Sequence, residues 1–414
     1  VCDSRVSPPG LDDLTRELPA VPVFTGGFDD QVFAAAERIV VSPGVPVAEP
    51  HVRDAHERGV EVLGDIELFA REAAAPIVAI TGSNGKSTVT VLAGAMARAA
   101  GMHVAIGGNL GEPALDLLSP GVELYVLELS SFQLETAWSL CPEAAVVLNV
   151  SPDHMDRYES VDAYAQVKAS IYAHAQTAVV NLDDPLVRAM AGGRERMVFS
   201  LEVPRAGEFG IREMDGRRWL SRGEQRLMAT DELLIAGRHN SANALAALAL
   251  GTAIGLPVGA MLKVLRTFRG LPHRTSFVAE IDGVRWYNDS KGTNTGACIA
   301  ALEGLDTADA SRTVLIAGGD CKGADFSELV PALSKYVRTL VLIGRDAPQI
   351  ARVAGEAVET DMASDLKDAV EQCRAHARAG DRVLLSPACA SFDMFRNYLD
   401  RGDRFMDAVR SLQT

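Results

Sequence analysis

The sequence predicts an α/β protein built around a parallel sheet. Apolar segments of strand length alternate with helical patterns over residues 65–270, as in parallel sheets covered by helices on both faces. One of these segments runs into a glycine-containing turn and then a helical pattern, which is the arrangement of a phosphate-binding loop. The 414 residues are too many for a single core, so two or three domains are expected.

Composition and charge narrow the class of protein. Hydrophobic residues make up 48% of the chain and charged residues 23%, as in soluble globular proteins. The net charge of −15 argues against a nucleic-acid partner, although an anionic small substrate can still meet a locally positive loop. The six cysteines have no metal-finger spacing, which favours free thiols in a reducing cytoplasm.

The start of the chain shows no basic segment followed by an apolar one, so no signal peptide is expected. Residue 1 is Val, and the natural N-terminus is therefore expected to be absent. Residues 240–262 carry no charge and are long enough to span a bilayer, but Gly255 and Pro257 interrupt them. Two helices of a soluble domain, the second started by Pro257, are expected there.

Residues 1–64 are predicted to form a small α/β unit. The chain opens on the end of a strand at Asp3, and a buried strand within residues 36–43 ends in a turn at Gly44. A helix over 51–58 and a short strand over 60–63 follow. An acidic residue at a strand end is well placed for ribose or base contacts, but it can equally cap the next element.

The phosphate loop is the strongest local signal. Strand 76–80 leads into Gly82-x-x-Gly85-Lys86-Ser87-Thr88 and a helix that reaches residue 100. Backbone N–H groups and the helix dipole would hold phosphate, Lys86 would reach the terminal phosphates, and a Ser87 or Thr88 hydroxyl would reach Mg²⁺. The usual loop has an earlier glycine where this chain has Ile80, so an ordinary strand–turn–helix connection is the alternative.

Polar residues also follow the next strands of this region. Strands are predicted over 102–106, 122–129 and 144–150, with a helix over 112–118 after the first. Ligands of parallel sheets gather at the carboxyl ends of the strands. Lys86, Asn109, Glu128 and His154 all fall at or just after such ends, and this convergence is more informative than any single residue.

Glu128 closes an apolar strand, where a carboxylate is costly unless it is paired or bound to a metal. Mg²⁺ takes few carboxylates together with phosphate oxygens and waters, which suits Glu128 beside a nucleotide. Capping of a helix N-terminus is the alternative for Glu128. His154 fits a metal ligand and an ordinary hydrogen-bonded histidine equally well.

The rest of the chain, after residue 200, also alternates between predicted strands and helices. Residues 205–230 are predicted as a short β excursion, and Asn240 and Asn243 then share one helix face, where they could contact a base or phosphate or simply cap the helix. In 271–414, polar loops at strand ends suggest a second anion pocket, although each alone could be a solvated connection. Strands are predicted near 276–281, 284–288, 312–317, 339–343 and 382–385, and the loops are 288–294, 318–322 and 386–393.

Seven motifs occur in the order found in the Mur ligases of peptidoglycan synthesis, which this chain resembles over essentially its whole length. They are Thr81-Gly-Ser-Asn-Gly-Lys-Ser-Thr88, Gly107-Gly-Asn-Leu-Gly111, Glu128-Leu-Ser-Ser-Phe-Gln-Leu-Glu135, Asp153-His-Met-Asp-Arg-Tyr158, His239-Asn-x-x-Asn243, Asn288-Asp-Ser-Lys291 and Leu385-Ser-Pro-Ala-Cys-Ala-Ser391. An ordered set of this size is far more specific than a phosphate loop alone.

The resemblance implies three α/β domains. These would be a Rossmann-like UDP-binding domain over 1–64, a central ATP-binding domain of P-loop type over 65–270, and a Rossmann-like amino-acid-binding domain over 271–414. The family's first domain begins with a strand and a glycine-rich turn that this chain lacks. Part of the UDP site is therefore expected to be missing from it.

The resemblance also implies an ATP-dependent ligation in cell-wall precursor synthesis. The γ-phosphate of ATP would pass to the carboxylate of UDP-MurNAc-L-alanine, and the amine of D-glutamate would attack the resulting acyl phosphate. ATP and two Mg²⁺ ions would take part, in a cytoplasmic protein that is a monomer. Two anions must meet in this reaction, so Lys86 and Mg²⁺ would provide the positive charge between them.

By similarity, the residues of the ATP and metal sites divide as follows. The catalytic residues would be Lys86, His154 and Lys168. The ATP contacts would be Gly82, Ser83, Asn84, Gly85, Lys86, Ser87, Thr88, Asn240, Asn243, Arg274, Asp289 and Lys291. The Mg²⁺ ligands would be Ser87, Glu128, His154 and Lys168, the last as a carbamate, since a bare lysine would repel the ion.

The two substrates of the ligation would bind elsewhere. The UDP-MurNAc-L-alanine contacts would be Asp3, Ser4, Arg5, Ser42, Pro43, Gly44, Asn109 and His154. The D-glutamate contacts would be Thr293, Lys322, Ser391, Phe392 and Tyr398.

Two alternatives stay open at this point. The first is a sister enzyme, either another Mur ligase or a folylpolyglutamate synthetase. The stretches 131–135 and 318–326 favour the D-glutamate enzyme, and the Asp-Asn-Pro-x-x-Arg motif of the diaminopimelate- or lysine-adding relative is absent. The second is a nucleotide-binding regulator without catalysis, against which the joint presence of Lys86, Glu128, His154 and Lys168 argues.

Overall fold

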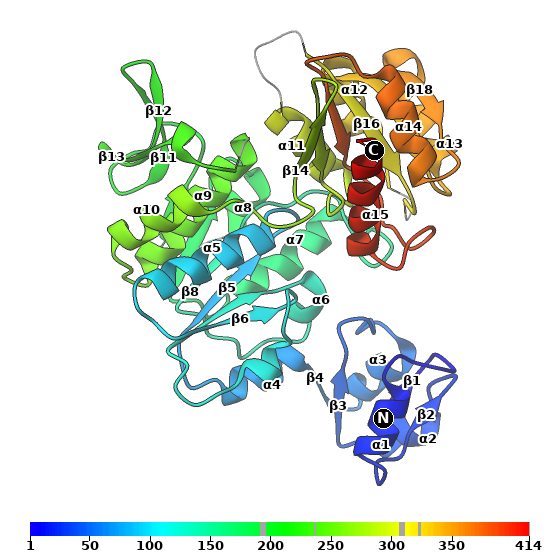
Figure 1. Cartoon of the computed structure of the whole chain (residues 1–414). Helices are drawn as coiled ribbons and strands as arrows, with labels where there is room; N and C mark the ends of the chain where they lie inside the picture. The colour runs from blue at the N-terminus through cyan, green and yellow to red at the C-terminus, as the bar shows by residue number, and fades with distance from the viewer. Residues whose placement is uncertain (191–195, 236, 306–310, 322–323, 414) are drawn as a thin grey trace.

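The computed structural model describes residues 1–190, 196–235, 237–305, 311–321 and 324–413, and it forms three α/β lobes in chain order (Figure 1). The N-terminal lobe, blue in Figure 1, contains two small parallel sheets and a core around Ile39, Val52 and Val62. Its elements are β1 (Cys2–Asp3), α1 (Leu11–Glu17), β2 (Phe24–Thr25), α2 (Asp30–Ala34), β3 (Arg38–Val41), α3 (Pro50–Glu57) and β4 (Glu61–Gly64).

The central lobe is a nine-stranded sheet in the order β13-β12-β11-β10-β9-β8-β5-β7-β6. The seven strands from β5 to β11 pair in parallel, and β12 and β13 extend the edge as an antiparallel ribbon, which confirms the predicted excursion at 205–230. The strands are β5 (Ile77–Thr81), β6 (Val104–Gly108), β7 (Leu124–Glu128), β8 (Ala144–Val147), β9 (Thr177–Asn181), β10 (Arg196–Phe199), β11 (Phe209–Met214), β12 (Arg217–Arg222) and β13 (Gln225–Ala229).

Helices cover both faces of this sheet, because alternate residues of its buried strands point to opposite sides. In β5, Val78 and Ile80 join the core beneath α5, α9 and α10, whereas Ile77 and Ala79 join the core beneath α4 and α8. The helices are α4 (Asp65–Glu72), α5 (Lys86–Ala99), α6 (Ser131–Leu134), α7 (Val161–Ala169), α8 (Pro185–Met190), α9 (Arg238–Ala253) and α10 (Val258–Thr267), with short 3₁₀ turns η1 (Ala114–Leu117), η2 (Ser170–Tyr172) and η3 (Thr230–Glu232).

The helix predicted over 112–118 is only the short turn η1, because Pro113 occupies the position before it and fixes an extended backbone there. The uncharged stretch forms two helices as predicted, with Pro257 at the N-cap of α10. Among the described residues, no helix is both long and apolar enough to cross a membrane.

The C-terminal lobe is a six-stranded sheet in the order β14-β15-β19-β16-β17-β18, parallel except for the β14–β15 hairpin. Strand β18 was not predicted, because it is a polar edge strand without apolar alternation. The elements are β14 (Ser276–Ile281), β15 (Val284–Asn288), α11 (Thr295–Leu305), β16 (Thr313–Gly318), η4 (Ser327–Leu329), α12 (Val330–Tyr336), β17 (Val337–Ile343), α13 (Ala347–Ala354), η5 (Gly355–Ala357), β18 (Glu359–Met362), α14 (Leu366–His376), β19 (Arg382–Leu385) and α15 (Tyr398–Ser411).

The packing of α9 on α5 and the sheet offers a test of the central core. Leu245 is fully buried between these elements, so Leu245→Ala should lower the free energy of unfolding by about 2–5 kcal/mol. Urea unfolding followed by circular dichroism measures the change. The control, Leu234→Ala, removes a side chain that is 52% exposed and should shift stability by no more than about 0.5 kcal/mol. Equal effects of the two substitutions would contradict this account of the core.

Candidate functional site

The loop between β5 and α5 has the backbone of a phosphate cradle. Gly82 and Gly85 adopt positive φ angles of 149° and 85°. A Cβ on Gly82 would lie 3.0 Å from Leu148 Cβ, and one on Gly85 would lie 2.5 Å from Asn243 Oδ1. Both positions therefore require glycine, and the loop ends at the N-terminus of a 14-residue helix whose dipole favours an anion.

Lys86, the first residue of α5, curls back over this loop. Its Nζ donates hydrogen bonds to the carbonyl oxygens of Gly82, at 2.9 Å, and Ser83, at 3.1 Å. Loss of hydration in the surrounding protein lowers the pKa of the Lys86 ammonium, while the negative charges of Glu128 and Asp153 oppose this effect. The ammonium therefore lies beside the cradle, where it can turn to a bound phosphate.

Glu128 at the end of β7 accepts hydrogen bonds from two polar side chains. Ser87 Oγ donates a hydrogen bond to Glu128 Oε2, and Asn109 Nδ2 donates to Oε1 at 2.7 Å. Arg274, which precedes the C-terminal sheet, donates from Nη2 to Ser87 Oγ at 2.7 Å. The carboxylate is 3% exposed, so its pairing offsets the cost of burial.

The Ser87–Glu128 pair fits Mg²⁺. A single carboxylate and a hydroxyl beside a phosphate cradle are a donor set that this ion completes with phosphate oxygens and water. No cluster of three or more His, Cys, Asp or Glu side chains suited to a metal occurs among the residues that the structure describes. The side chains present therefore suit an ion held largely by its nucleotide rather than by a closed protein cage.

His154 belongs to a tight turn that is anchored to α6. Its backbone has a positive φ of 58°, and its carbonyl accepts hydrogen bonds from the N–H groups of Arg157 and Tyr158. The imidazole lies edge-on to the Phe132 ring, with 4.7 Å between centroids. Tyr158 OH donates to Glu135 Oε1 at 2.7 Å, so the turn is fixed to the residue that ends the α6 motif.

Arg157 connects this turn to the N-terminal lobe. Its guanidinium forms a bidentate ion pair with Glu135 and lies 4.1 Å above the centroid of the Phe132 ring. Nη1 also donates to the carbonyl oxygen of Pro43 at 2.9 Å, and Nη2 donates to that of Val45 at 3.5 Å. Arg157 belongs to one of the sequence motifs but had no predicted role, because its partners are distant in the chain.

Lys168 of α7 is 1% exposed, which is rare for a lysine. Its Nζ lies 3.1 Å from the Gly82 carbonyl oxygen, 3.4 Å from Thr81 Oγ1 and 4.4 Å from the centroid of the Tyr164 ring. Burial, together with the nearby charge of Lys86, lowers the pKa of Lys168 well below its usual value. This lowering of the pKa favours the neutral amine, which is the nucleophilic form.

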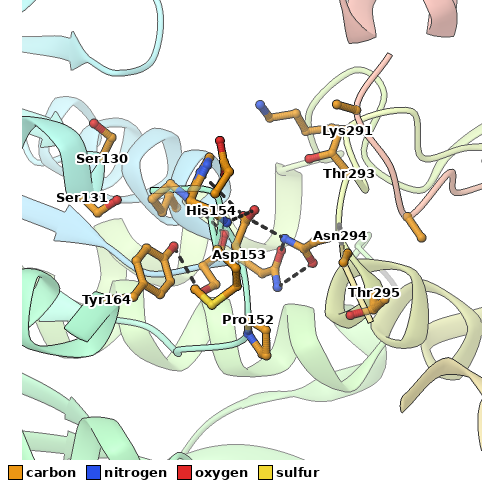
Figure 2. Close-up of a pocket in the computed structure, with 18 of the residues that line it drawn as sticks. Ser130, Ser131, Pro152, Asp153, His154, Tyr164, Lys291, Thr293, Asn294 and Thr295 are labelled. Carbon is orange, nitrogen blue, oxygen red and sulfur yellow. Dashed lines mark hydrogen bonds and ion pairs between the residues drawn. The ribbon is translucent and has the colours of Figure 1, made fainter. Parts of the chain in front are cut away.

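These side chains line one cavity of about 520 Å³ between the central and C-terminal lobes. Figure 2 shows Asp153, His154 and Tyr164 on the central side and Lys291, Thr293 and Asn294 facing them. Asn294 Nδ2 lies 3.3 Å from Asp153 Oδ2 and from Asn84 Oδ1, so the two lobes are joined across the cavity.

A smaller cavity of about 210 Å³ adjoins the other side of the phosphate loop, and Asn240, Asn243, Arg274, Asp289 and Lys291 line it. Asp289 accepts hydrogen bonds from the Thr275 N–H at 2.9 Å and Ser386 Oγ at 2.7 Å. Burial raises the pKa of Asp289 to about 6 and lowers that of Lys291 to about 8, with the Arg274 charge adding to the second effect. These five of the twelve predicted ATP contacts thus line one cavity.

Several predicted substrate residues line neither cavity. Phe392 is 68% exposed, Ser391 is buried, and Tyr398 lies beneath Lys291, whose Nζ is 4.2 Å from the ring centroid. Lys322 lies outside the described residues. The predicted uridine residues Asp3, Ser4, Arg5, Ser42, Pro43 and Gly44 are all in the N-terminal lobe, away from both cavities.

The ion pair between Arg5 and Asp3, 2.6 Å long, orders the start of this predicted uridine region. The Arg5 side chain lowers the pKa of Asp3 to about 2. Three polar cavity residues without a predicted role, Asp153, Tyr164 and Asn294, also surround the site. Asp153 precedes His154 in a sequence motif that follows a strand end. This position in the sequence could have indicated that Asp153 belongs to the site.

Comparison with known proteins identifies all three lobes. Residues 1–64 match a model of the MurD-like N-terminal domain of Mur ligases, residues 80–251 the Mur ligase middle domain, and residues 273–389 the Mur ligase glutamate ligase domain. A UDP-N-acetylmuramoylalanine–D-glutamate ligase from Marinobacter nauticus is 53% identical over the whole chain and 92% of its own length. The enzymes of that name from Pseudomonas fluorescens and Nitrosococcus oceani are 54% and 52% identical over the whole chain.

Solved structures share the fold at lower identity. MurF ligase from Thermotoga maritima, in complex with ADP, superposes with a TM-score of 0.64 at 16% identity and covers 92% of this chain and 96% of its own. Folylpolyglutamate synthase from Mycobacterium tuberculosis superposes with a TM-score of 0.59 at 17% identity, covering 83% and 92%. The ordered motifs, the three domain matches and full-length identity above 50% establish that the chain belongs to the Mur ligase family.

Proposed function

We propose that this protein joins D-glutamate to UDP-N-acetylmuramoyl-L-alanine at the expense of ATP. The full-length identity of 52–54% to curated enzymes named for this reaction carries the proposal. The cavity supports it, because a phosphate cradle on one lobe faces cationic and polar loops on another. We propose further that the enzyme acts as a monomer in the cytoplasm.

The reaction would proceed in two steps. A carboxylate oxygen of the UDP substrate attacks the γ-phosphorus of ATP, and ADP leaves. The amine of D-glutamate then attacks the acyl carbon, phosphate leaves, and the nitrogen loses a proton. Both steps bring anions together, so their rates depend on cations held in a site that excludes water.

Different residues of this chain would hold the phosphate, the nucleotide and the metal ions. The glycine loop and Lys86 hold the transferring phosphate, and Arg274 holds the other side of the nucleotide from the C-terminal lobe. Bound Mg²⁺ would neutralise phosphate charge, with Ser87 and Glu128 holding one ion and His154 and carbamylated Lys168 a second. Holding the carboxylate and phosphate in contact supplies proximity, which can reach effective molarities of about 10⁵–10⁸ M.

The direct test is phosphate release from ATP in the presence of the UDP substrate. D-Glutamate, L-glutamate, meso-diaminopimelate and no amino acid are compared. Release that depends on D-glutamate alone supports the proposal. Release with another amino acid would move the protein to a sister ligase, and nucleotide binding without release in any mixture would favour the non-catalytic regulator.

Replacing Lys86 tests the phosphoryl-transfer step. Lys86→Ala should lower turnover by about 10²–10³-fold or more, which is the scale for removing one preorganised group that stabilises developing charge. Steady-state phosphate release measures the loss. Lys263→Ala removes an exposed lysine from α10 and should leave turnover unchanged. Wild-type turnover in Lys86→Ala would show that this lysine has no role in phosphate transfer.

Lys168 tests the second metal site. A neutral buried amine can add CO₂, with an N–C bond formed and a proton released, and the carbamate so formed is an anionic oxygen donor. Lys168→Ala should therefore lose activity and partly regain it with short-chain carboxylic acids, which replace the missing carboxylate. Removing CO₂ and bicarbonate should also slow the wild-type enzyme. A variant that no acid restores, beside a wild type indifferent to CO₂, would rule out the carbamate.

Arg157 tests the connection between the His154 turn and the N-terminal lobe. Arg157→Met keeps an unbranched side chain but removes the guanidinium, and with it the contact with the Phe132 ring, the Glu135 ion pair and the bonds to the Pro43 and Val45 carbonyls. We expect KM for the UDP substrate to rise by about tenfold, which corresponds to about 1.4 kcal/mol, and KM for ATP to stay constant.

Arg217→Met is a matched control for Arg157→Met. Arg217 also pairs with a carboxylate, Asp231, and also lies over an aromatic ring, that of Trp219, but in the β12–β13 ribbon outside both cavities. Its substitution should leave both KM values unchanged. If Arg157→Met raised the two KM values equally, or neither, Arg157 would not position the UDP substrate.

A further inference from the structure

Two buried thiols meet beside the main cavity, and neither of them has a role in the proposed ligation. Cys321 follows β16 and lines the cavity, and Cys389 follows β19. Their Sγ atoms are 2.9 Å apart, although the residues are 68 positions apart in the chain. All six cysteines of the chain are free, and the thiols of Cys321 and Cys389 are in direct contact.

The backbone holds these two residues in register. Asp320 and Ala390 exchange both of their backbone hydrogen bonds, at 3.0 Å each, and so form an antiparallel bridge. Cys321 and Cys389 are the next opposed pair. In an antiparallel pairing the positions next to a hydrogen-bonded pair are not hydrogen-bonded to each other, and their Cα atoms lie about 4.5 Å apart. Disulfides span Cα separations of about 4.4–6.8 Å, so this register suits one.

The backbone polar groups of the two cysteines have hydrogen-bond partners outside the pair, as this register requires. The Cys321 N–H donates to Asp346 Oδ2 at 2.8 Å, and the Cys389 carbonyl oxygen accepts from Arg401 Nη1 at 3.2 Å. Neither group turns toward the opposite cysteine. Arg401 is fully buried and also donates to the Ser290 carbonyl oxygen at 2.7 Å, so the Cys389 backbone is firmly held. The facing side chains can therefore be joined without disturbing a backbone hydrogen bond.

We propose that Cys321 and Cys389 form a reversible disulfide when the protein meets a peroxide. The peroxide oxidises the Cys321 thiol to a sulfenic acid and releases one water. The Cys389 sulfur then attacks the Cys321 sulfur, the S–O bond breaks, and a second water leaves. Two thiols and one hydrogen peroxide thus give one disulfide and two waters, and a small dithiol reverses the bond by exchange.

The environment decides which thiol reacts first and how fast. Cys321 lines the cavity and Cys389 does not, so a small oxidant in the cavity meets Cys321 first. Hydrogen bonding to Cys321 and burial raise the pKa of Cys389, and the Arg401 charge only partly opposes this. Because the thiolate is the reactive form, bond formation should be slow at neutral pH and faster as the pH rises.

The disulfide would fasten two loops of the proposed amino-acid site. Cys321 immediately precedes Lys322, and Cys389 lies two residues before Ser391, both of which are predicted D-glutamate contacts. This consequence rests on the proposed function, whereas the bond itself does not. A fixed pair of loops should hinder entry of the amino acid but leave the phosphate cradle, on the other lobe, unchanged.

Peptide mapping of the full-length protein tests the bond. The protein is treated with hydrogen peroxide, its remaining thiols are alkylated under denaturing conditions, and it is digested and analysed by mass spectrometry. We expect a peptide pair joined through Cys321 and Cys389, two hydrogens lighter than its reduced components and lost after dithiothreitol. Cys389→Ser and Cys321→Ala, made separately in case one misfolds, should each abolish the pair, and Cys298→Ser, at a buried neighbouring thiol, should not.

Two further measurements test whether the disulfide restrains the loops of the amino-acid site. The cross-linked protein should unfold at a higher temperature than the reduced protein, and its KM for D-glutamate should rise severalfold while KM for ATP stays constant. Failure to find the 321–389 peptide, or a bond to Cys298 instead, would overturn the proposal. A cross-link with an unchanged KM for D-glutamate would overturn its effect on the loops. A reduced wild type without ligase activity would refute the proposed function and leave the bond standing.

Discussion

The buried carboxylate of Glu128 is the constraint on which the site depends. It ends β7, a fully buried strand beside the edge strand β6, where an unpaired charge would be strongly unfavourable. Ser87 from the phosphate helix and Asn109 from the neighbouring strand end both donate to it. Arg274 then reaches the same Ser87 from the C-terminal lobe. One acidic group thereby fixes the mutual positions of the nucleotide loop, the next strand end and a second lobe.

Positively charged side chains surround this carboxylate, although the net charge of the protein is −15. Lys86, Lys168, Arg274 and Lys291 all line the main cavity, and burial lowers the pKa of each. The positive charges of Lys86 and Arg274 lower the pKa of Lys291 further, so these groups destabilise one another in the absence of an anion. A bound triphosphate would relieve this repulsion. Part of the binding free energy of the triphosphate would therefore come from the electrostatic repulsion already present in the site.

Much of this arrangement could be predicted from the sequence, because its determinants are local. The glycines of the phosphate loop, the apolar period of β5 and β7, and the polar residues after strand ends each act within a few residues. The interactions that were missed join distant segments: Arg157 reaches Glu135 and Pro43, and Asn294 reaches Asp153 and Asn84. Strand β18 was missed for a related reason, since an edge strand needs no apolar alternation when its partner β17 supplies the hydrogen bonds.

The division of the site between lobes bears on how the reaction can be gated. The phosphate cradle, Glu128 and Lys168 are carried by one sheet, whereas Arg274, Lys291 and Thr293 come from the lobe across the cavity. The hydrogen bonds that join the lobes here, from Arg274 to Ser87 and between Asn294 and Asn84, are made by side chains that would also face the nucleotide. A ligand that recruits these side chains would therefore alter the interactions between the lobes as it binds. Completion of the catalytic site and the relative position of the two lobes are then linked through the same few side chains, which is how substrate binding can favour one arrangement over another.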